Sequence, residues 1–316
     1  MPRLTSPTPC RSGWYVRLLP LVAMLAALDG GRRAVAASET SPAPPPVAAS
    51  VPQAGQPHTI PDFGLILLPV KAGKFTMGSP YSESGRRDDE IEHTVTLTRP
   101  FWLGRTPVTQ GQYQRLMGTN PSRFKDQSPD LPVETVSWDE AMDFGRILTE
   151  RERAAGRLPA GYRYTLPTEA QREYACRAGT TGRYAGDLNA IAWYSGNSDE
   201  KPQPVAAKQP NAWGFYDLQG NIWEWCRDWY GNYPSEPVTD PTGPANGSQR
   251  VYRGGAWFHS ADLCRSAYRY RIEPSYRGSL LGFRLALTPD DPAPPAGNRE
   301  SVPAETHPLP SAPKAR

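Results

Sequence analysis

The chain has 316 residues, with 35 lysines and arginines against 32 aspartates and glutamates, and a formal net charge of +3 at pH 7. No block of basic residues stands out from this near balance, which excludes the electrostatic footprint of a nucleic-acid-binding protein. The 36 prolines, 28 glycines, nine tryptophans and 15 tyrosines favour a loop-rich fold packed around aromatic side chains over a helical bundle.

The N-terminal segment has the pattern of an export signal. Three arginines precede the apolar run LLPLVAMLAAL at 18–28, and AVAAS at 34–38 offers small residues for cleavage. The apolar run is too short for a membrane-spanning helix, which needs about 20 residues. We therefore predict a signal peptide over 1–37 and a periplasmic or secreted protein with no membrane span after cleavage. An uncleaved anchor is the alternative.

Two segments rich in proline and alanine flank the part of the chain that is expected to fold. The predicted linker covers 38–57, and a tail over 289–316 repeats its composition. Neither segment has enough apolar residues to form a core, so both are expected to be disordered. The remaining residues, 58–288, have a size that a single domain can reach.

The first half of this domain carries strand and helix signals. LILLPVKAGKFTMGS at 65–79 predicts two strands joined by a turn, and HTVTLT at 93–98 predicts a third that stops before Pro100. Three helix starts have a capping box, in which a hydroxyl accepts a backbone N–H and the residue three positions later reaches back. The three pairs are Thr109 with Gln112, Ser137 with Glu140, and Thr168 with Gln171.

The second half, residues 180–288, has almost no helical periodicity. Glycine, proline, asparagine and aspartate separate short aromatic segments, which predicts mostly irregular loop. A loop of that length inside a compact domain is usually functional or stabilised by an ion.

Four segments together resemble one family. They are GKFTMGS (73–79), LPTEAQREYACRAG (166–179), GFYDLQGNIWEWCRDWY (214–230), and RVYRGGAWFHSADLCRSAYR (250–269) with LGFRLAL (281–287). In this order they resemble the sulfatase-modifying-factor family, whose founding activity is that of the formylglycine-generating enzyme. The resemblance implies a single α+β domain with a modified C-type-lectin-like core, little regular secondary structure and bound structural calcium.

One segment departs from the family's usual LPTEAEWEYA, because this chain has Gln171 and Arg172 where glutamate and tryptophan are common. Arg172 loses a packing aromatic and gains a cation that could pair with a glutamate of the same helix. We interpret the difference as a local surface change.

GNIWEW at 220–225 predicts a calcium site. Asn221 and Glu224 are three residues apart, so one turn can direct both side chains to a common point, and Ca²⁺ takes six to eight oxygen ligands. By resemblance the family's structural site falls on Asn221, Ile222 and Glu224, and a second site near AWYSGNSD falls on Asn197. A turn flanked by core tryptophans is the alternative reading of GNIWEW.

The segment after Gly254-Gly255 places His259 five residues before Cys264. In the family's enzymes two cysteines at this spacing hold Cu(I), because two soft thiolates select that ion. Counted without gaps, the two positions fall on His259 and Cys264, and counted from the downstream motifs Cys264 lies outside the pair. We therefore do not expect copper. A metal-binding or nucleophilic pair of His259 with Cys264 is the alternative.

Three cysteines follow the predicted signal: Cys176, Cys226 and Cys264. In the family the cysteine of the LPTEA helix pairs with one in the strand leading toward GFR. The resemblance therefore implies a Cys176–Cys264 disulfide and leaves Cys226 free.

These features favour a calcium-stabilised, non-catalytic binding or accessory module that keeps the scaffold and lacks the copper site. Its partner is expected to be an exported protein or peptide, and the sequence leaves the oligomeric state open. The alternative is a protein- or peptide-modifying oxidase of the formylglycine-generating type that uses Cys264. By resemblance the ligand-facing residues are Trp257, Phe258, His259, Ser260, Asp262, Tyr268, Tyr270, Arg271 and Tyr276.

Overall fold

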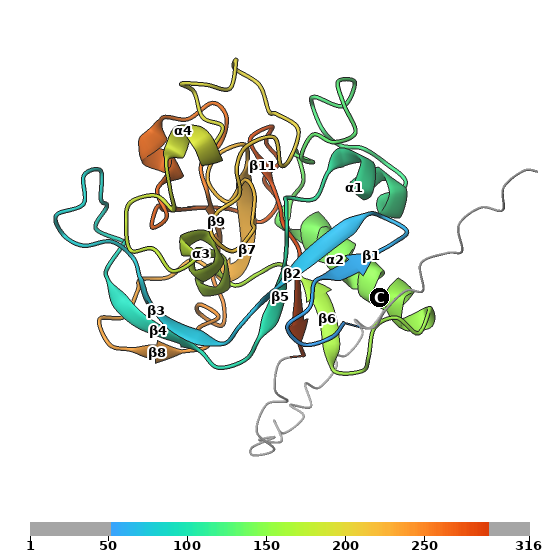
Figure 1. The fold of residues 1–316 in the computed structure, drawn as a ribbon, viewed down its shortest axis with the longest axis horizontal. Coiled ribbons are helices and arrows are strands. Elements are labelled where there is room, and N and C mark those ends of the chain that lie inside the picture. Colours follow the sequence, from blue (N-terminus) through green and yellow to red (C-terminus); the bar gives the residue numbers. More distant parts are fainter. Residues whose placement is uncertain (1–51, 291–316) are drawn as a thin grey trace, which may run out of the picture. The chain divides into compact units, whose positions relative to one another are not determined.

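The largest sheet brings together strands from the two ends of the folded segment (Figure 1). The computed structural model describes residues 52–290, so the predicted signal peptide, most of the predicted linker and nearly all of the predicted tail lie outside the described residues. Five strands make this sheet in the order β1-β2-β5-β12-β6, and all neighbours are antiparallel. The strands are β1 His58–Ile60, β2 Leu65–Val70, β5 Phe101–Gly104, β6 Tyr162–Thr165 and β12 Ala286–Pro289.

Two smaller sheets complete the fold, one built from the second half of the domain and one that pairs two strands of the first half with a strand of the second. One has the order β10-β9-β7-β11, with β11 parallel to β7, and the other has the order β3-β4-β8, with β8 parallel to β4. Between 180 and 288 these short strands are separated by irregular segments, as the sequence predicts. The strands are β3 Gly73–Met77, β4 His93–Leu97, β7 Trp223–Trp229, β8 Val238–Thr239, β9 Arg250–Arg253, β10 Arg269–Ile272 and β11 Leu281–Gly282.

The helices begin where the capping boxes predict. They are α1 Gln110–Met117, α2 Trp138–Ala154, α3 Glu169–Arg177, the short α4 Leu188–Ile191, and a 3-10 helix, η1, at Ala261–Cys264. In each of α1, α2 and α3 both reciprocal hydrogen bonds of the capping box are formed. Within residues 52–290, no helix combines the length and the apolar character that crossing a membrane requires.

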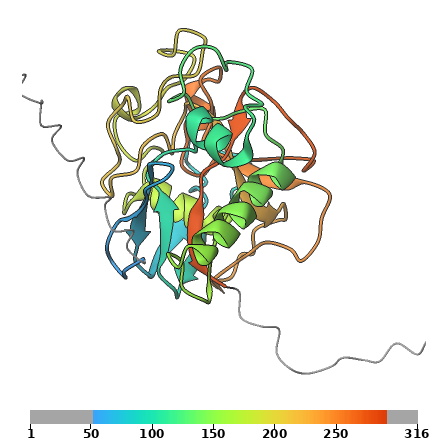
Figure 2. The same ribbon diagram turned by 90° about the vertical axis from the view of Figure 1, so that its right-hand side faces the viewer.

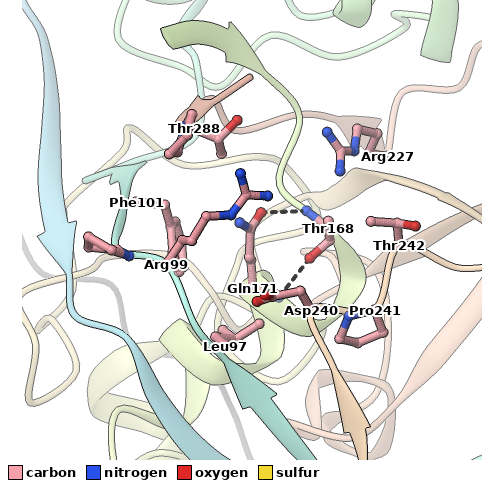
Figure 3. A pocket seen from close by; sticks show the side chains of 12 residues that line it. Leu97, Arg99, Phe101, Thr168, Gln171, Arg227, Asp240, Pro241, Thr242 and Thr288 are labelled. Atoms are coloured by element: carbon pink, nitrogen blue, oxygen red, sulfur yellow. Dashed lines mark hydrogen bonds between the residues drawn. The ribbon is translucent and has the colours of Figure 1, made fainter. Parts of the chain in front are cut away.

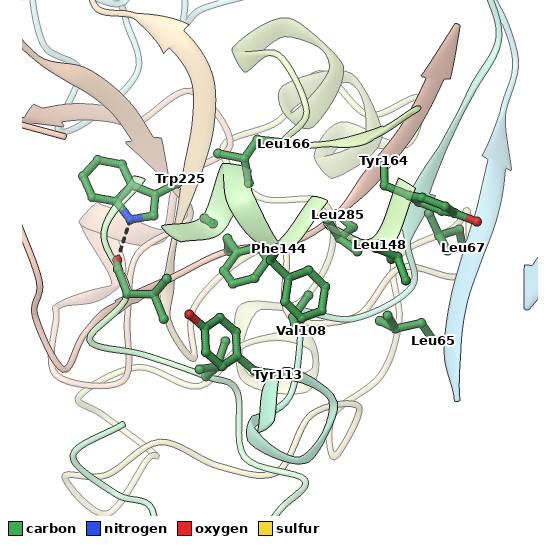
Figure 4. Packing of buried hydrophobic residues seen from close by; sticks show 14 of the residues in the cluster. Leu65, Leu67, Val108, Tyr113, Phe144, Leu148, Tyr164, Leu166, Trp225 and Leu285 are labelled. Carbon is green, nitrogen blue, oxygen red and sulfur yellow. Dashed lines mark hydrogen bonds between the residues drawn. The ribbon is translucent and has the colours of Figure 1, made fainter. Parts of the chain in front are cut away.

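Helix α2 packs its apolar face onto the five-stranded sheet, with α1 next to it (Figure 2). Gly145 allows this approach, because a Cβ there would lie 2.8 Å from the carbonyl oxygen of Tyr164 in β6. Phe144 stacks on Tyr113 of α1, with ring centroids 5.6 Å apart, and this pair belongs to the same buried cluster as Trp225 of β7 (Figure 4). Mixed helices and sheets with few helical residues confirm the predicted α+β class.

Candidate functional site

Cys264 is enclosed at the end of η1. Its side chain is fully buried and packs with Leu188, Ile191 and Ala192 around α4. Gly255 lies so close that a Cβ there would be 2.5 Å from the sulfur, and its φ of +76° is one that glycine adopts without strain. Burial raises the pKa of the Cys264 thiol to about 12. The thiol is therefore neutral at physiological pH, whereas nucleophilic attack and metal binding use the thiolate.

His259 is held by a tryptophan of β7. The Nε1–H of Trp223 donates to its Nδ1 at 3.1 Å, and the two ring centroids are 5.5 Å apart in an edge-to-face arrangement. An indole nitrogen only donates, so Nδ1 of His259 is the acceptor and the ring proton is on Nε2. Burial also lowers the pKa of His259, which favours the neutral ring. The hydrogen-bond partner of the Cys264 sulfur is the carbonyl of Ser260, so the predicted catalytic residues His259 and Cys264 have separate partners.

The predicted Cys176–Cys264 disulfide is not formed in this structure, in which Cys176, Cys226 and Cys264 are all free and buried. Cys176 lies in α3 with its sulfur 3.9 Å from the carbonyl oxygen of Leu218 and 4.0 Å from Oγ of Ser266. It packs in a different apolar cluster from Cys264. Burial raises the pKa of the Cys176 thiol as well.

Glu224, a predicted calcium ligand, has both carboxylate oxygens bound by arginines. Nε of Arg172 donates to Oε2 at 2.9 Å, and Nη2 of Arg284 donates to Oε1 at 2.8 Å. Burial alone would raise the pKa of Glu224, but the two guanidinium groups outweigh it and hold that pKa below its usual range. The interpretation of Arg172 as a surface residue is wrong, because its side chain is 1% exposed and its ion-pair partner lies in β7 instead of in its own helix.

The other predicted calcium ligands also have protein partners. Asn221 accepts the backbone N–H of Gln203 at 3.1 Å and donates to the Gln203 carbonyl at 3.0 Å. Asn197 closes its own turn, accepting from the backbone N–H of Tyr194 and donating to the carbonyl of Ala192. Ile222 is fully buried in the core.

These contacts do not fit a calcium ion bound to Glu224. A carboxylate that ligates Ca²⁺ needs free oxygen lone pairs, and two guanidinium groups already supply the positive charge beside this one. Across residues 52–290, the acidic, histidine and cysteine side chains form no group of three or more that could hold a metal ion. The pairing of Arg172 and Arg284 with Glu224 was not predicted from the sequence. Its signal was the arginine at position 172, where the family usually has tryptophan.

Aromatic side chains from three neighbouring strands make a continuous layer on the β10-β9-β7 sheet. Trp223 of β7 packs on Tyr252 of β9, with ring centroids 5.2 Å apart, and Tyr252 faces Tyr270 across the β9–β10 pair at 5.6 Å. Tyr268 stacks parallel to Tyr270 at 6.4 Å, and the guanidinium of Arg87 lies over both of these rings, 5.7 and 5.5 Å from their centroids. We call these five residues the aromatic surface.

The predicted ligand-facing residues divide into exposed and buried ones. Trp257 and Tyr268 are both 8% exposed and pack inward, and His259 is half-buried. Arg87, Trp223 and Tyr252 were not predicted as ligand-facing residues, and Arg87 lies far from the 257–276 segment in sequence. The exposed members are Phe258, Ser260, Asp262, Tyr270, Arg271 and Tyr276.

The α+β fold with short strands, few helices and a buried cysteine beside a Gly-Gly turn defines a formylglycine-generating-enzyme-like domain of the C-type-lectin-like type. The chain belongs to the family of sulfatase-modifying factor enzyme 1-like domains, whose model matches residues 56–289. The predicted family is therefore confirmed.

Relatives are similar over most of the chain. The formylglycine-generating enzyme of Streptomyces coelicolor is 29% identical over 326 aligned residues, which cover 78% of this chain and 96% of that protein. Among solved structures, Treponema denticola variable protein 1 is 32% identical with a TM-score of 0.66, covering 74% of this chain and 99% of that one. PvdO from Pseudomonas aeruginosa is 28% identical with a TM-score of 0.65, covering 75% of this chain and all of that one.

Proposed function

We propose that this domain is a non-catalytic binding module of an exported protein, and that the aromatic surface together with Phe258 contacts a protein or peptide partner. The observation that carries the proposal is the state of Cys264, a buried neutral thiol with no second sulfur at the position of His259. Burial raises the pKa of this thiol to about 12, which keeps it neutral at pH 7.

Oxidation of a substrate cysteine through Cu(I) needs two soft thiolates that can exchange with the incoming thiol. His259 offers one imidazole nitrogen as an acceptor, and the indole of Trp223 already uses it. The similarity to the Streptomyces enzyme therefore supports a shared scaffold, and the donor atoms in this chain favour binding over oxidation.

The aromatic surface suits protein recognition because its exposed members, Tyr270 and Arg87, combine area with polar atoms. Tyr270 is 43% exposed, and two further aromatic side chains outside the five are also open to solvent, Tyr276 at 40% and Phe258 at 59%. Tyrosine, tryptophan and arginine are the residues that most often dominate the binding energy of protein interfaces. Arg87, stacked on two tyrosines, is held in place before any partner arrives, which reduces the entropy lost on binding.

Two measurements test the proposal. Purified protein supplied with Cu(I) and O₂ is expected to leave the cysteine of a sulfatase-type peptide unconverted. Turnover that disappears in Cys264→Ala would show that the domain is an oxidase and that the proposal is wrong.

The second measurement concerns the partner. Selection of peptides against the immobilised domain is expected to give binders that Tyr270→Ala and Phe258→Ala each weaken by at least about tenfold. Trp213→Ala is the control, since Trp213 is 36% exposed and contacts Tyr174 instead of the aromatic surface. Binders that are insensitive to Tyr270→Ala and Phe258→Ala would place the ligand elsewhere.

A further inference from the structure

A small pocket lies at the start of α3. None of its lining residues belongs to the aromatic surface. Segments from five parts of the chain meet there: the turn between β4 and β5, the first turn of α3, β7, the residues after β8 and the end of β12 (Figure 3). Its volume is about 40 Å³. About 10–15 Å³ holds one water molecule, so the enclosed part admits one small chemical group and excludes an extended molecule.

The pocket has an excess of positive charge. The guanidinium groups of Arg99 and Arg227 line it, and Asp240 is its one lining carboxylate (Figure 3). Both oxygens of Asp240 already accept hydrogen bonds from Thr98, one from the backbone N–H at 2.8 Å and one from the hydroxyl. Arg99 uses Nη1 on the carbonyl of Asp290 at 3.2 Å. The lining thus has one more basic than acidic side chain, which favours an anion over a cation.

A buried hydroxyl in the same pocket has no partner. Thr288 lines the pocket near the end of β12, is 6% exposed, and its Oγ1 makes no hydrogen bond to any residue in 52–290. Buried hydroxyl groups are nearly always hydrogen-bonded in native proteins, so an orphan of this kind points to a bound ion or water.

Gln171 in the first turn of α3 adds a donor to the pocket. Oε1 of Gln171 accepts the backbone N–H of Thr168 at 2.9 Å, so the oxygen of the Gln171 amide is used and its NH₂ group remains as a donor. Gln171 and Arg99 both line the pocket (Figure 3). The N-terminus of a helix also carries partial positive charge, which stabilises a nearby anion.

We propose that this pocket binds a small oxyanion of the phosphate or sulfate class, with Arg99, Arg227, the Gln171 amide and the Thr288 hydroxyl as its hydrogen-bond donors. The ligand is either the free ion or the terminal group of an ester, since both present the same oxygens. The inference does not depend on the partner of the aromatic surface.

Gln171→Glu tests the pocket without removing the helix cap. Glutamate at this position completes a capping box as well as glutamine does, but it replaces a donor facing the pocket with a carboxylate. Gln112→Glu is the matched control, because Gln112 makes the same capping box in α1 with Oε1 2.9 Å from the N–H of Thr109. Both variants change the net charge equally.

Calorimetric titration of the purified protein with inorganic phosphate and sulfate is expected to show saturable binding below about 10 mM. Gln171→Glu should weaken the affinity for the anion at least about tenfold, and so should Arg99→Gln, whose side chain is partly open to solvent. Gln112→Glu should leave the affinity unchanged. Methyl phosphate distinguishes the sources, since equal or tighter binding assigns the site to an ester and rejection assigns it to the free ion. Absence of saturable binding, or equal affinity in Gln171→Glu, would overturn the proposal.

Discussion

The chemistry open to Cys264 is set by the residues that enclose it. Leu188, Ile191 and Ala192 form an apolar wall, and Gly255 closes the remaining side. Desolvation disfavours the thiolate, which is the reason that the pKa of this thiol rises instead of falling as it does in reactive cysteines.

We expect Cys176, Cys226 and Cys264 to resist alkylation in the folded protein at pH 8 and to react fully after denaturation. All three are buried, and burial raises the pKa of each. Mass spectrometry after iodoacetamide treatment counts the modified thiols in a chain that lacks residues 1–37.

Ser260→Cys supplies the control for this experiment. Ser260 is exposed at the N-terminus of η1, so a thiol there should react without denaturation. Rapid modification of native Cys264 would contradict the enclosed state and restore the reactive-cysteine alternative.

Helix α3 shows how one element depends on another that is distant in sequence. Asp228, near the end of β7, accepts the first backbone N–H of α3, from Glu169, at 3.0 Å. Burial, assisted by the charge of the Glu169 side chain, raises the pKa of Asp228 to about 7. Its unfolded pKa is near 3.8, so the folded state binds the proton more tightly between these two values.

The stabilising contribution of protonated Asp228 is complete below about pH 4 and is lost as the pH rises through about 7. Asp228→Asn keeps an acceptor for Glu169 and removes the charge. At pH 8 the variant should therefore be more stable than the parent by about 2–4 kcal/mol, and the difference should shrink toward zero as the pH falls to 4. Urea unfolding at several pH values measures it.

Asp143→Asn on the exposed face of α2 is the control, because Asp143 is 55% exposed and its ion pair with Arg146 is a surface one. Its effect should stay below about 1 kcal/mol at every pH. Parallel stability curves for Asp228→Asn and the parent would show that Asp228 is ionised in the folded protein.

Elements whose signals are local could be predicted from the sequence, and long-range contacts could not. The capping boxes at Thr109, Ser137 and Thr168 each depend on residues three positions apart, and all three begin a helix. The pair of Arg172 with Glu224 joins residues 52 positions apart, and nothing in hydrophobic periodicity identifies such a partner. The family resemblance predicted the fold correctly, and the structure does not contain the Cys176–Cys264 disulfide that it also implied.

At the scale of the whole molecule, buried ion pairs connect the irregular second half of the domain to the first. Glu169 of α3 pairs with Arg253 of β9 and Arg269 of β10. The irregular segment after η1 is connected in the same way, because Arg265 pairs with glutamates on the chain between β3 and β4. Arg172 and Arg284 both form ion pairs with Glu224. The buried carboxylates of Glu169 and Glu224 are therefore compensated by arginines of the chain itself.

If Arg172 and Arg284 neutralise Glu224 in place of a calcium ion, a chelator has no ion to remove there. We expect EGTA to leave the melting temperature unchanged and Arg172→Met to lower the stability by about 3–5 kcal/mol, because removing one partner strands a buried charge. Arg146→Met is the control: Arg146 is 57% exposed in surface ion pairs, so its loss should cost less than about 1 kcal/mol. Calorimetric melting of the three proteins with and without EGTA decides the question. A lower melting temperature in EGTA, or equal stability of the two variants, would show that Glu224 depends on a bound cation instead of on Arg172.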